Sequence, residues 1–246
     1  MSAALKRQPH RIPVEALISV DLETTGGGGK VIELGAIVLK PDGTLGPKVS
    51  TLVRQPMAEL TTKQARFCQH RVHHITPREI QRDGLPEDEV AARFQCWIAA
   101  VRGKYPGARL AAYNVSCERT FLGKAPWSLE EDWYDIRDAV KAYHDDKGGK
   151  LSAVAPALGV DVGESHRALD DAQSAALVLA TLRARLTAPR RREELADWQM
   201  DRFKQDGCCW WIQPDFQFEP QPVDPRATAA PPSGFVARTG DERGPV

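Results

Sequence analysis

The sequence predicts an α/β fold in which helices cover a mixed β-sheet. Three apolar and partly β-branched segments come first, at residues 14–23, 31–40 and 49–54, and the turns between them are short. Short connections favour antiparallel neighbours, so these segments predict a meander. Further along, short apolar segments alternate with helix-patterned ones, which favours helices packed on the faces of the same sheet.

Turn residues and periodicity mark the individual elements. Glycines at residues 26–29 and Pro-Asp-Gly at residues 41–43 form the two turns of the meander. Two later strands are expected, at residues 109–113 and 133–135. Helical spacing of apolar residues predicts helices at residues 60–70, 87–102, 115–122, 150–158 and 168–186, and Thr76 with Pro77 opens a further short one.

Composition excludes several classes of protein. The 33 basic and 33 acidic side chains balance, which argues against binding a polyanion by bulk charge and still allows a local basic patch. The five cysteines form no Cys-x-x-Cys pair, so neither a disulfide framework nor a thiolate zinc site is indicated. Zinc bound by Cys68, His70, His73 and His74 is a minor alternative, because their spacing fits no usual ligand pattern.

Chain organisation follows from changes in composition. We expect a flexible N-terminal arm at residues 1–13, one domain at 14–187, a helical extension at 188–218 and a disordered tail at 219–246. No run is long enough to span a membrane, and the polar N-terminus does not read as a signal peptide. A cytoplasmic protein without a membrane partner is therefore expected.

Two acids end the first predicted strand. Side chains alternate across a strand, so Asp21 and Glu23 share one face about 7 Å apart, and Leu22 points to the other. Carboxylates this close repel each other unless a cation lies between them. An exposed strand end with two solvated acids is the alternative for this pair.

A third acid begins the longest predicted helix. Asp171 leads a stripe that continues through Ala175, Val178 and Leu182 and should face inward. An unpaired carboxylate in such a place is costly, although helix capping is a simpler explanation. His166 lies five residues earlier, and a histidine on a loop is by itself unremarkable.

A fourth acid follows the strand at residues 109–113. Asn114 is expected to cap the next helix, which places Glu118 in its first turns and turns residues 121 and 122 inward. Alone, Glu118 would be interpreted as a solvated helix residue.

Taken together, these segments resemble the DEDDh, DnaQ-like 3′→5′ exonucleases. Residues 21–26 (DLETTG) with 31–36 (VIELGA) resemble the first motif of that family, and 166–172 (HRALDDA) its third. Residues 113–122 (YNVSCERTFL) take the place of the second, and 72–76 (VHHIT) resemble the V-H-G-I-T segment before it. The resemblance covers roughly residues 14–186.

The resemblance implies a ribonuclease-H-like fold, with a five-stranded sheet of three antiparallel and two parallel strands flanked by helices. It implies hydrolysis of nucleic acid, DNA in preference to RNA, from the 3′ end to nucleoside 5′-monophosphates by two Mg²⁺ or Mn²⁺ ions. The implied metal ligands are Asp21, Glu23, Glu118 and Asp171, with His166 as the general base. The implied substrate-binding residues are Leu22, Thr24, His73 and Asn114.

The second motif departs from the family pattern. Tyr113 replaces its histidine, Cys117 its phenylalanine, and Glu118 its aspartate. Glutamate is one methylene longer, so its oxygen can still reach a metal-bound water with a less fixed geometry. A catalytically weakened nucleic-acid-binding module of the same fold therefore stands as the alternative function, and a glycosidase using paired acids is a more distant one.

Overall fold

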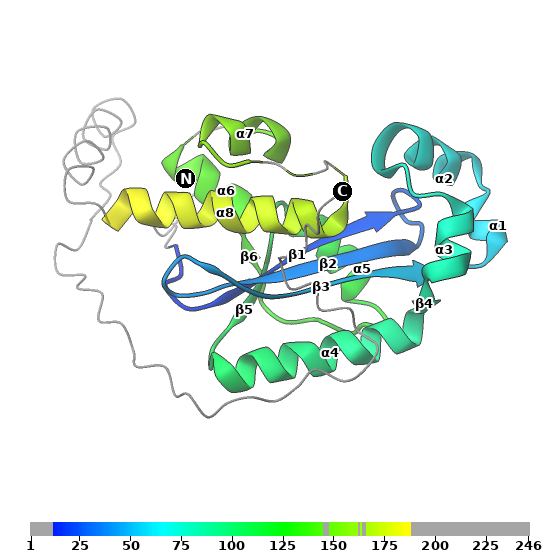
Figure 1. Ribbon diagram of the computed structural model, residues 1–246, viewed down its shortest axis with the longest axis horizontal. Coiled ribbons are helices and arrows are strands. Elements are labelled where there is room, and N and C mark those ends of the chain that lie inside the picture. Colours follow the sequence, from blue (N-terminus) through cyan, green and yellow to red (C-terminus); the bar gives the residue numbers. More distant parts are fainter. Residues whose placement is uncertain (1–11, 145–147, 162, 164–165, 188–246) are drawn as a thin grey trace, which may run out of the picture.

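The computed structural model describes residues 12–144, 148–161, 163 and 166–187. Most of the expected arm, and all of the expected helical extension and tail, lie outside these residues. The described part is a six-stranded sheet with helices on both faces, as Figure 1 shows. None of its helices is long and apolar enough to cross a bilayer.

The first three strands form the predicted meander. β1 (Leu17–Thr24) pairs antiparallel with β2 (Val31–Leu39), which pairs antiparallel with β3 (Leu45–Arg54). Two parallel strands then extend the sheet on the β1 side, β5 (Arg109–Ala112) and β6 (Tyr134–Asp135).

The expected number of five strands was one too low. β4 (Leu85–Pro86) pairs parallel with the end of β3, so the order across the sheet is β4-β3-β2-β1-β5-β6. Two residues are too few for a periodic pattern, and this strand exists because the chain entering the next helix passes along β3.

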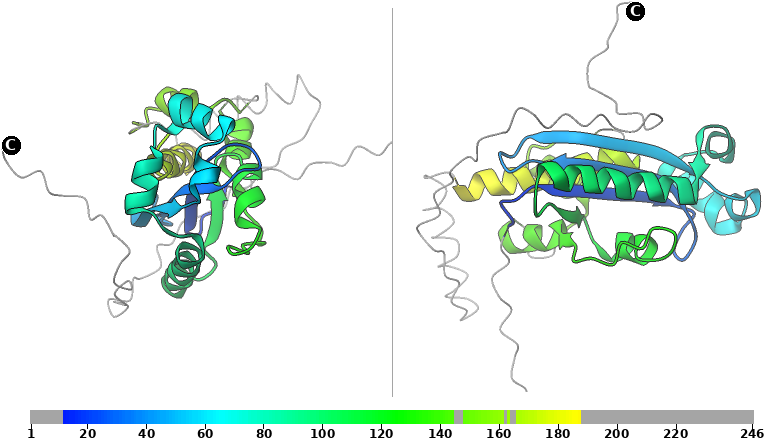
Figure 2. Two further views of the ribbon diagram at one scale, coloured as in Figure 1. Left: turned by 90° about the vertical axis from the view of Figure 1, so that its right-hand side faces the viewer. Right: turned by 90° about the horizontal axis from the view of Figure 1, so that it is seen from below.

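Helices divide between the two faces of the sheet. The long helix α4 (Glu87–Lys104) packs on one face with α5 (Ser116–Leu122), over the side chains of Ile18, Val20 and Leu22. The other face carries α6 (Ile136–Tyr143), α7 (Leu151–Ala157) and α8 (Ala168–Thr187). Figure 2 shows the sheet edge-on between α4 and the α8 layer.

A third group of helices gathers at one end of the sheet. It contains α1 (Met57–Leu60), α2 (Lys63–Cys68), a single wide turn η1 (Gln69–His73) and α3 (Pro77–Asp83). The single helix predicted at residues 60–70 is interrupted, because the Thr62 hydroxyl accepts a hydrogen bond from Ala65 N and starts a new helix there. Leu60, Ile75 and Ile80 pack on Ile32 of β2, which fixes this group beside the end of β1.

Candidate active site

The acids of β1 lie on the face that α8 covers. Since Ile18, Val20 and Leu22 point into the core beneath α4, Asp21 and Glu23 point the other way. Asp21 pairs with Gly35 of β2, and Glu23 pairs with Glu33. This register places three acidic side chains on one small area of the sheet.

Gly35 allows α8 to begin directly against the sheet. A Cβ atom built on Gly35 would lie 2.2 Å from Ala168 C and from Leu169 N, so no larger residue fits without moving the helix. The close approach brings Asp171, in the first turn of α8, to the acids of β1. The stripe behind it, Ala175, Val178 and Leu182, is buried as its spacing predicts.

His166 joins this cluster from the segment before α8. Its backbone has a φ of 67°, and its N–H donates a hydrogen bond to Asp171 Oδ2 over 3.1 Å. One ligand atom each from Glu23, His166 and Asp171 lies within 4.8 Å of the others. Among the described residues this is the one group of three or more such side chains suited to a metal ion, and the Cys68–His74 alternative forms none.

An ion pair holds the residue next to His166. Arg167 Nη2 donates to Glu33 Oε1 over 2.7 Å, Arg167 Nε donates to both carboxylate oxygens over 3.2 Å, and Ala168 N donates to Oε2 over 3.0 Å. The Glu33 side chain is only 2% exposed, so this fork ties the start of α8 to β2. Sequence reasoning missed Glu33, whose only signal was a single charge inside an otherwise apolar strand.

Glu118 approaches from the opposite side of β1. It is 3% exposed in the short helix α5, and its Oε2 atom is buried without a hydrogen-bond partner among the described residues. Such an orphaned oxygen is costly unless a cation or water occupies the space beside it.

The turn that carries Glu118 is held by the carboxylate of Asp135. Asp135 Oδ1 accepts from Asn114 N over 3.2 Å, and Oδ2 accepts from Val115 N over 3.3 Å. Oδ1 also accepts from Arg137 N over 2.9 Å and so caps α6. One carboxylate therefore fixes the end of β5 and the starts of two helices.

Burial and mutual repulsion raise the pKa values of the clustered carboxyls. Burial, then Glu118, Glu23, Asp171 and Glu33 in that order, raise the pKa of Asp21 well above its usual range. Burial, with repulsion by Asp171 and Glu33, raises the pKa of Glu23 to about 8.

The other two acids are shifted in the same direction. Burial is the main cause that raises the pKa of Glu118 to about 8, and burial also raises the pKa of Asp171. The cluster thus offers four carboxylates with raised pKa values, and one of their oxygens, Glu118 Oε2, has no hydrogen-bond partner among the described residues. Mg²⁺ and Mn²⁺ prefer such hard oxygen ligands and would stabilise their charged form, so the residues fit divalent cations.

The residues expected to bind substrate differ in their exposure and in their hydrogen bonds. Leu22 is buried toward α4 and Thr24 Oγ1 accepts from Gly26 N over 3.2 Å. Asn114 is exposed with a φ of 78°, so it does not cap α5 as expected; that helix begins at Ser116. Its backbone conformation is instead held by the Asp135 carboxylate.

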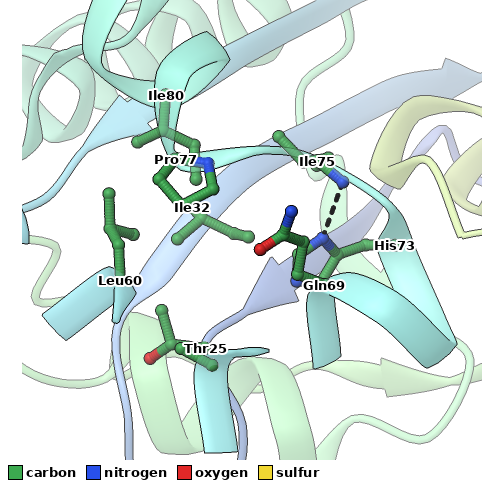
Figure 3. A pocket seen from close by; sticks show the side chains of 9 residues that line it. Thr25, Ile32, Leu60, Gln69, His73, Ile75, Pro77 and Ile80 are labelled. Carbon is green, nitrogen blue, oxygen red and sulfur yellow. Dashed lines mark hydrogen bonds between the residues drawn. The ribbon is translucent and has the colours of Figure 1, made fainter. Parts of the chain in front are cut away.

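His73 is buried and not an open contact. Its Nδ1 accepts from Ile75 N over 3.0 Å, as the dashed line in Figure 3 shows, and Gln69 lies beside it in a small pocket. Burial, with the nearby His74, His166 and Arg167, lowers the pKa of His73 to about 4. The ring is therefore neutral at pH 7, and its buried Nε2 has no partner among the described residues.

Comparisons with known proteins agree with this geometry. A family model described as an exonuclease (RNase_T) matches residues 18–179. The DNA polymerase III PolC-type of Clostridium perfringens (strain 13 / Type A) is 30% identical over 168 residues, which are 65% of this chain and 10% of that polymerase. The chain thus spans about a tenth of the length of this curated relative.

Three solved structures share the fold. The nuclease domain of 3′hExo, a DEDDh family member bound to rAMP, has a TM-score of 0.57 and 20% identity over 69% of this chain and 91% of that one. S. pombe Pop2p in its Mg²⁺ and Mn²⁺ bound form has a TM-score of 0.55 and 14% identity, covering 74% of this chain and 85% of that one. E. coli Exonuclease I with a dT13 oligonucleotide has a TM-score of 0.52 and 19% identity, covering 76% and 43%.

The match to the family model falls on the part of the chain that holds the acidic cluster. The family model begins within β1 and ends within α8, so it contains all four acids and His166. The sheet with its antiparallel and parallel strands is that of the ribonuclease-H-like fold. The chain therefore belongs to the exonuclease family that this model describes.

Proposed function

We propose that the protein is a 3′→5′ exonuclease that removes nucleoside 5′-monophosphates from single-stranded or frayed ends of DNA. The observation that supports this most strongly is the approach of Glu23, His166 and Asp171 to within 4.8 Å, beside Asp21. DNA is the proposed substrate because a relative that is 30% identical to this chain is a DNA polymerase. RNA is the second candidate, since 3′hExo was solved with rAMP.

The four acids would hold two divalent cations, Mg²⁺ or Mn²⁺. Asp21, Glu23 and Asp171 beside the sheet, with Glu118 on α5, would be the ligands that hold them. The cations would neutralise charge on the phosphate and lower the pKa of the attacking water. The chain contributes the geometry, since the β1–β2 register and the contact of α8 with Gly35 hold the acids in place before substrate arrives.

His166 would take the proton of the attacking water. It is exposed, and it lies beside Asp171 without the burial that its acidic neighbours have. An exposed imidazole that can reach water and stands next to an acidic cluster suits a general base. Leu22 and Thr24 would hold the terminal nucleotide through the backbone, with Asn114 next to it and His73 supporting the segment behind it.

The test of this function is release of mononucleotides from matched 5′-labelled single-stranded DNA, RNA and mismatched duplex, with Mg²⁺ and with Mn²⁺. We expect stepwise shortening from the 3′ end, fastest on single-stranded or mismatched DNA. Binding without any shortening in either metal would instead support the weakened binding module.

The His166→Ala variant tests the proposed base separately. We expect its turnover to fall by roughly 10²-fold while metal affinity stays nearly unchanged. The measurement is a pH–rate profile with a metal titration. A variant that loses metal affinity and keeps the acidic limb of its profile would show that His166 is a ligand or structural.

A further inference from the structure

The segment from α2 to the start of α3 carries basic charge alone. Residues 60–78 contain Lys63, Arg66, Arg71 and Arg78 and no aspartate or glutamate, in a chain whose formal net charge is +0. All four side chains are exposed. A local patch of positive charge is compatible with a net charge of zero, and it suits the binding of a polyanion.

An exposed aromatic ring lies among these charges. Phe67 is 62% exposed, more than the other large exposed apolar residues in the described part of the chain, Val14 at 40% and Met57 at 50%. A single exposed apolar side chain is ordinary on a protein surface. What distinguishes Phe67 is the basic side chain on each side of it. Lys63 stands four residues earlier on the same face of α2, and Arg71 lies four residues later in the adjoining turn η1.

The helix that carries Phe67 adjoins the acidic cluster. Gln64 packs against Gly26, directly after β1, because a Cβ on Gly26 would lie 2.5 Å from Gln64 Cγ. Cys68 follows Gln64 by four residues, and burial raises the pKa of its thiol, with the nearby Glu23 carboxylate raising it further. Phe67 is carried by the same short helix as Gln64 and Cys68, so it lies at the end of the sheet where the acids of β1 are.

The helix that presents Phe67 is firmly anchored. Thr62 caps its start, and Ala65 is buried beneath it. The preceding Leu60 packs on Ile32 of β2. A ring held on such a support loses little freedom when a planar partner stacks on it.

We propose that Phe67 is a stacking platform for an unpaired base of the nucleic-acid strand, with Lys63 and Arg71 contacting the phosphates beside it. This subsite rests on the proposed function and adds to it a second contact outside the carboxylate cluster. Aromatic side chains flanked by cations bind single strands with little sequence preference, because every base has a π-face.

The test is the affinity for a 5′-fluorescein-labelled dT12 strand, measured by anisotropy in the Asp21→Asn background so that the strand is not degraded. Phe67→Ala is expected to raise the Kd about 5- to 100-fold, and Phe67→Tyr, which keeps a ring, to leave it within about twofold. Met57→Ala removes a comparably exposed apolar side chain at the same end of the sheet and serves as the unchanged control. Equal affinity of Phe67→Ala and its parent would overturn the platform.

Abasic strands separate stacking from other contacts. When abasic residues replace the bases one at a time, one position should weaken binding to the parent and have little effect on Phe67→Ala. A defect of Phe67→Ala that persists at every abasic position would overturn the stacking role. Lys63→Ala and Arg71→Ala should each lower the salt dependence of binding by about one phosphate contact, and an unchanged slope would overturn that part.

A small substrate keeps the two proposals distinguishable. Hydrolysis of the p-nitrophenyl ester of thymidine 5′-monophosphate by the unaltered protein requires the carboxylates and no second base. If the unaltered protein hydrolyses neither this ester nor dT12, the proposed function fails. If it degrades dT12 and Phe67→Ala binds and degrades the strand equally well, the platform alone fails.

Discussion

The proposed metal site has two halves that the fold supports very differently. The sheet half consists of Asp21, Glu23 and Asp171, which lie on β1 and on the helix packed against Gly35. The helix half is Glu118, on a seven-residue helix whose N-cap residue makes no side-chain hydrogen bond. The register of β1 with β2 and the backbone contact of α8 with Gly35 fix the sheet half. The turn before α5 fixes the helix half.

The two halves differ in the contacts that must break before their acids can move. In the sheet half, Asp21 pairs with Gly35 of β2, and its strand β1 lies between β2 and β5 in the sheet. In the helix half, the start of α5 depends on the Asp135 carboxylate, which accepts from Asn114 N and Val115 N. Damage to the sheet half should therefore remove activity, and damage to the turn should loosen one metal site.

Asp21→Asn should have the largest effect. Asp21 is the carboxylate that all the other acids repel, so it is their shared neighbour, and we expect turnover to fall on the order of 10³-fold. Because a repelling charge disappears, the melting temperature without metal should rise or stay equal. The measurement is turnover with Mn²⁺ alongside thermal unfolding in EDTA; turnover within tenfold of the parent would contradict the assignment.

Gly35→Ala should come next. The added methyl group would overlap the backbone of Ala168 and Leu169, so α8 must shift and carry Asp171 with it. A displacement of about 1 Å can cost roughly 10²-fold in rate. Gly103→Ala is the matched control, because its Cβ would meet nothing within 4 Å in α4, where alanine is the better helix former. Equal activity of the two variants would show that the close approach is dispensable.

The features predicted from the sequence are those encoded by neighbouring residues. The meander, the shared face of Asp21 and Glu23 and the buried stripe of α8 follow from periods of two and 3.6 residues. They needed no knowledge of what the strands and helices pack against. The family was likewise evident from motifs whose residues are close together in the chain.

The features that were missed depend on partners far away in the chain. Glu33 gives no sign that Arg167, 134 positions later, neutralises it. The expected cap at Asn114 was wrong because Asp135, 21 positions later, holds its backbone N–H and leaves the helix to begin at Ser116. The local sequence correctly predicted a turn at Asn114, but the contact with Asp135 determines its backbone conformation.

Asp135→Ala tests the helix half. Losing the carboxylate frees the turn before Glu118, so we expect metal affinity or turnover to fall about 10- to 100-fold, together with about 1 kcal/mol of stability from the lost cap of α6. The measurement is a Mn²⁺ titration of turnover beside denaturant unfolding. Asp138→Ala is the control, since that exposed residue in the same helix only pairs with Lys141. A stability loss with unchanged metal dependence would make Asp135 purely structural.

The smallest predicted effect concerns pH and joins both halves. The pKa values of Glu23 and Glu118 are raised from 4.5 to about 8 by burial and, for Glu23, by its acidic neighbours. Between these values the folded protein keeps protons that the unfolded chain has released, so stability falls as pH rises toward 8. His73 acts in the opposite direction at lower pH, because its pKa falls from 6.5 to about 4 and the unfolded chain alone binds a proton there.

The interval from pH 6.5 to 8 therefore isolates the carboxylates. In EDTA the melting temperature should fall by several degrees across it. Divalent cations favour the charged carboxylates, so added Mn²⁺ should raise the melting temperature more at pH 8 than at pH 6.5. Asp21→Asn should flatten the EDTA profile because it removes the Asp21 carboxyl, whose own pKa is raised well above its usual range and which therefore contributes to the slope. A melting temperature in EDTA that rises from pH 6.5 to 8 would mean that the acids are already paired without metal, and neither half would then need a cation to hold it.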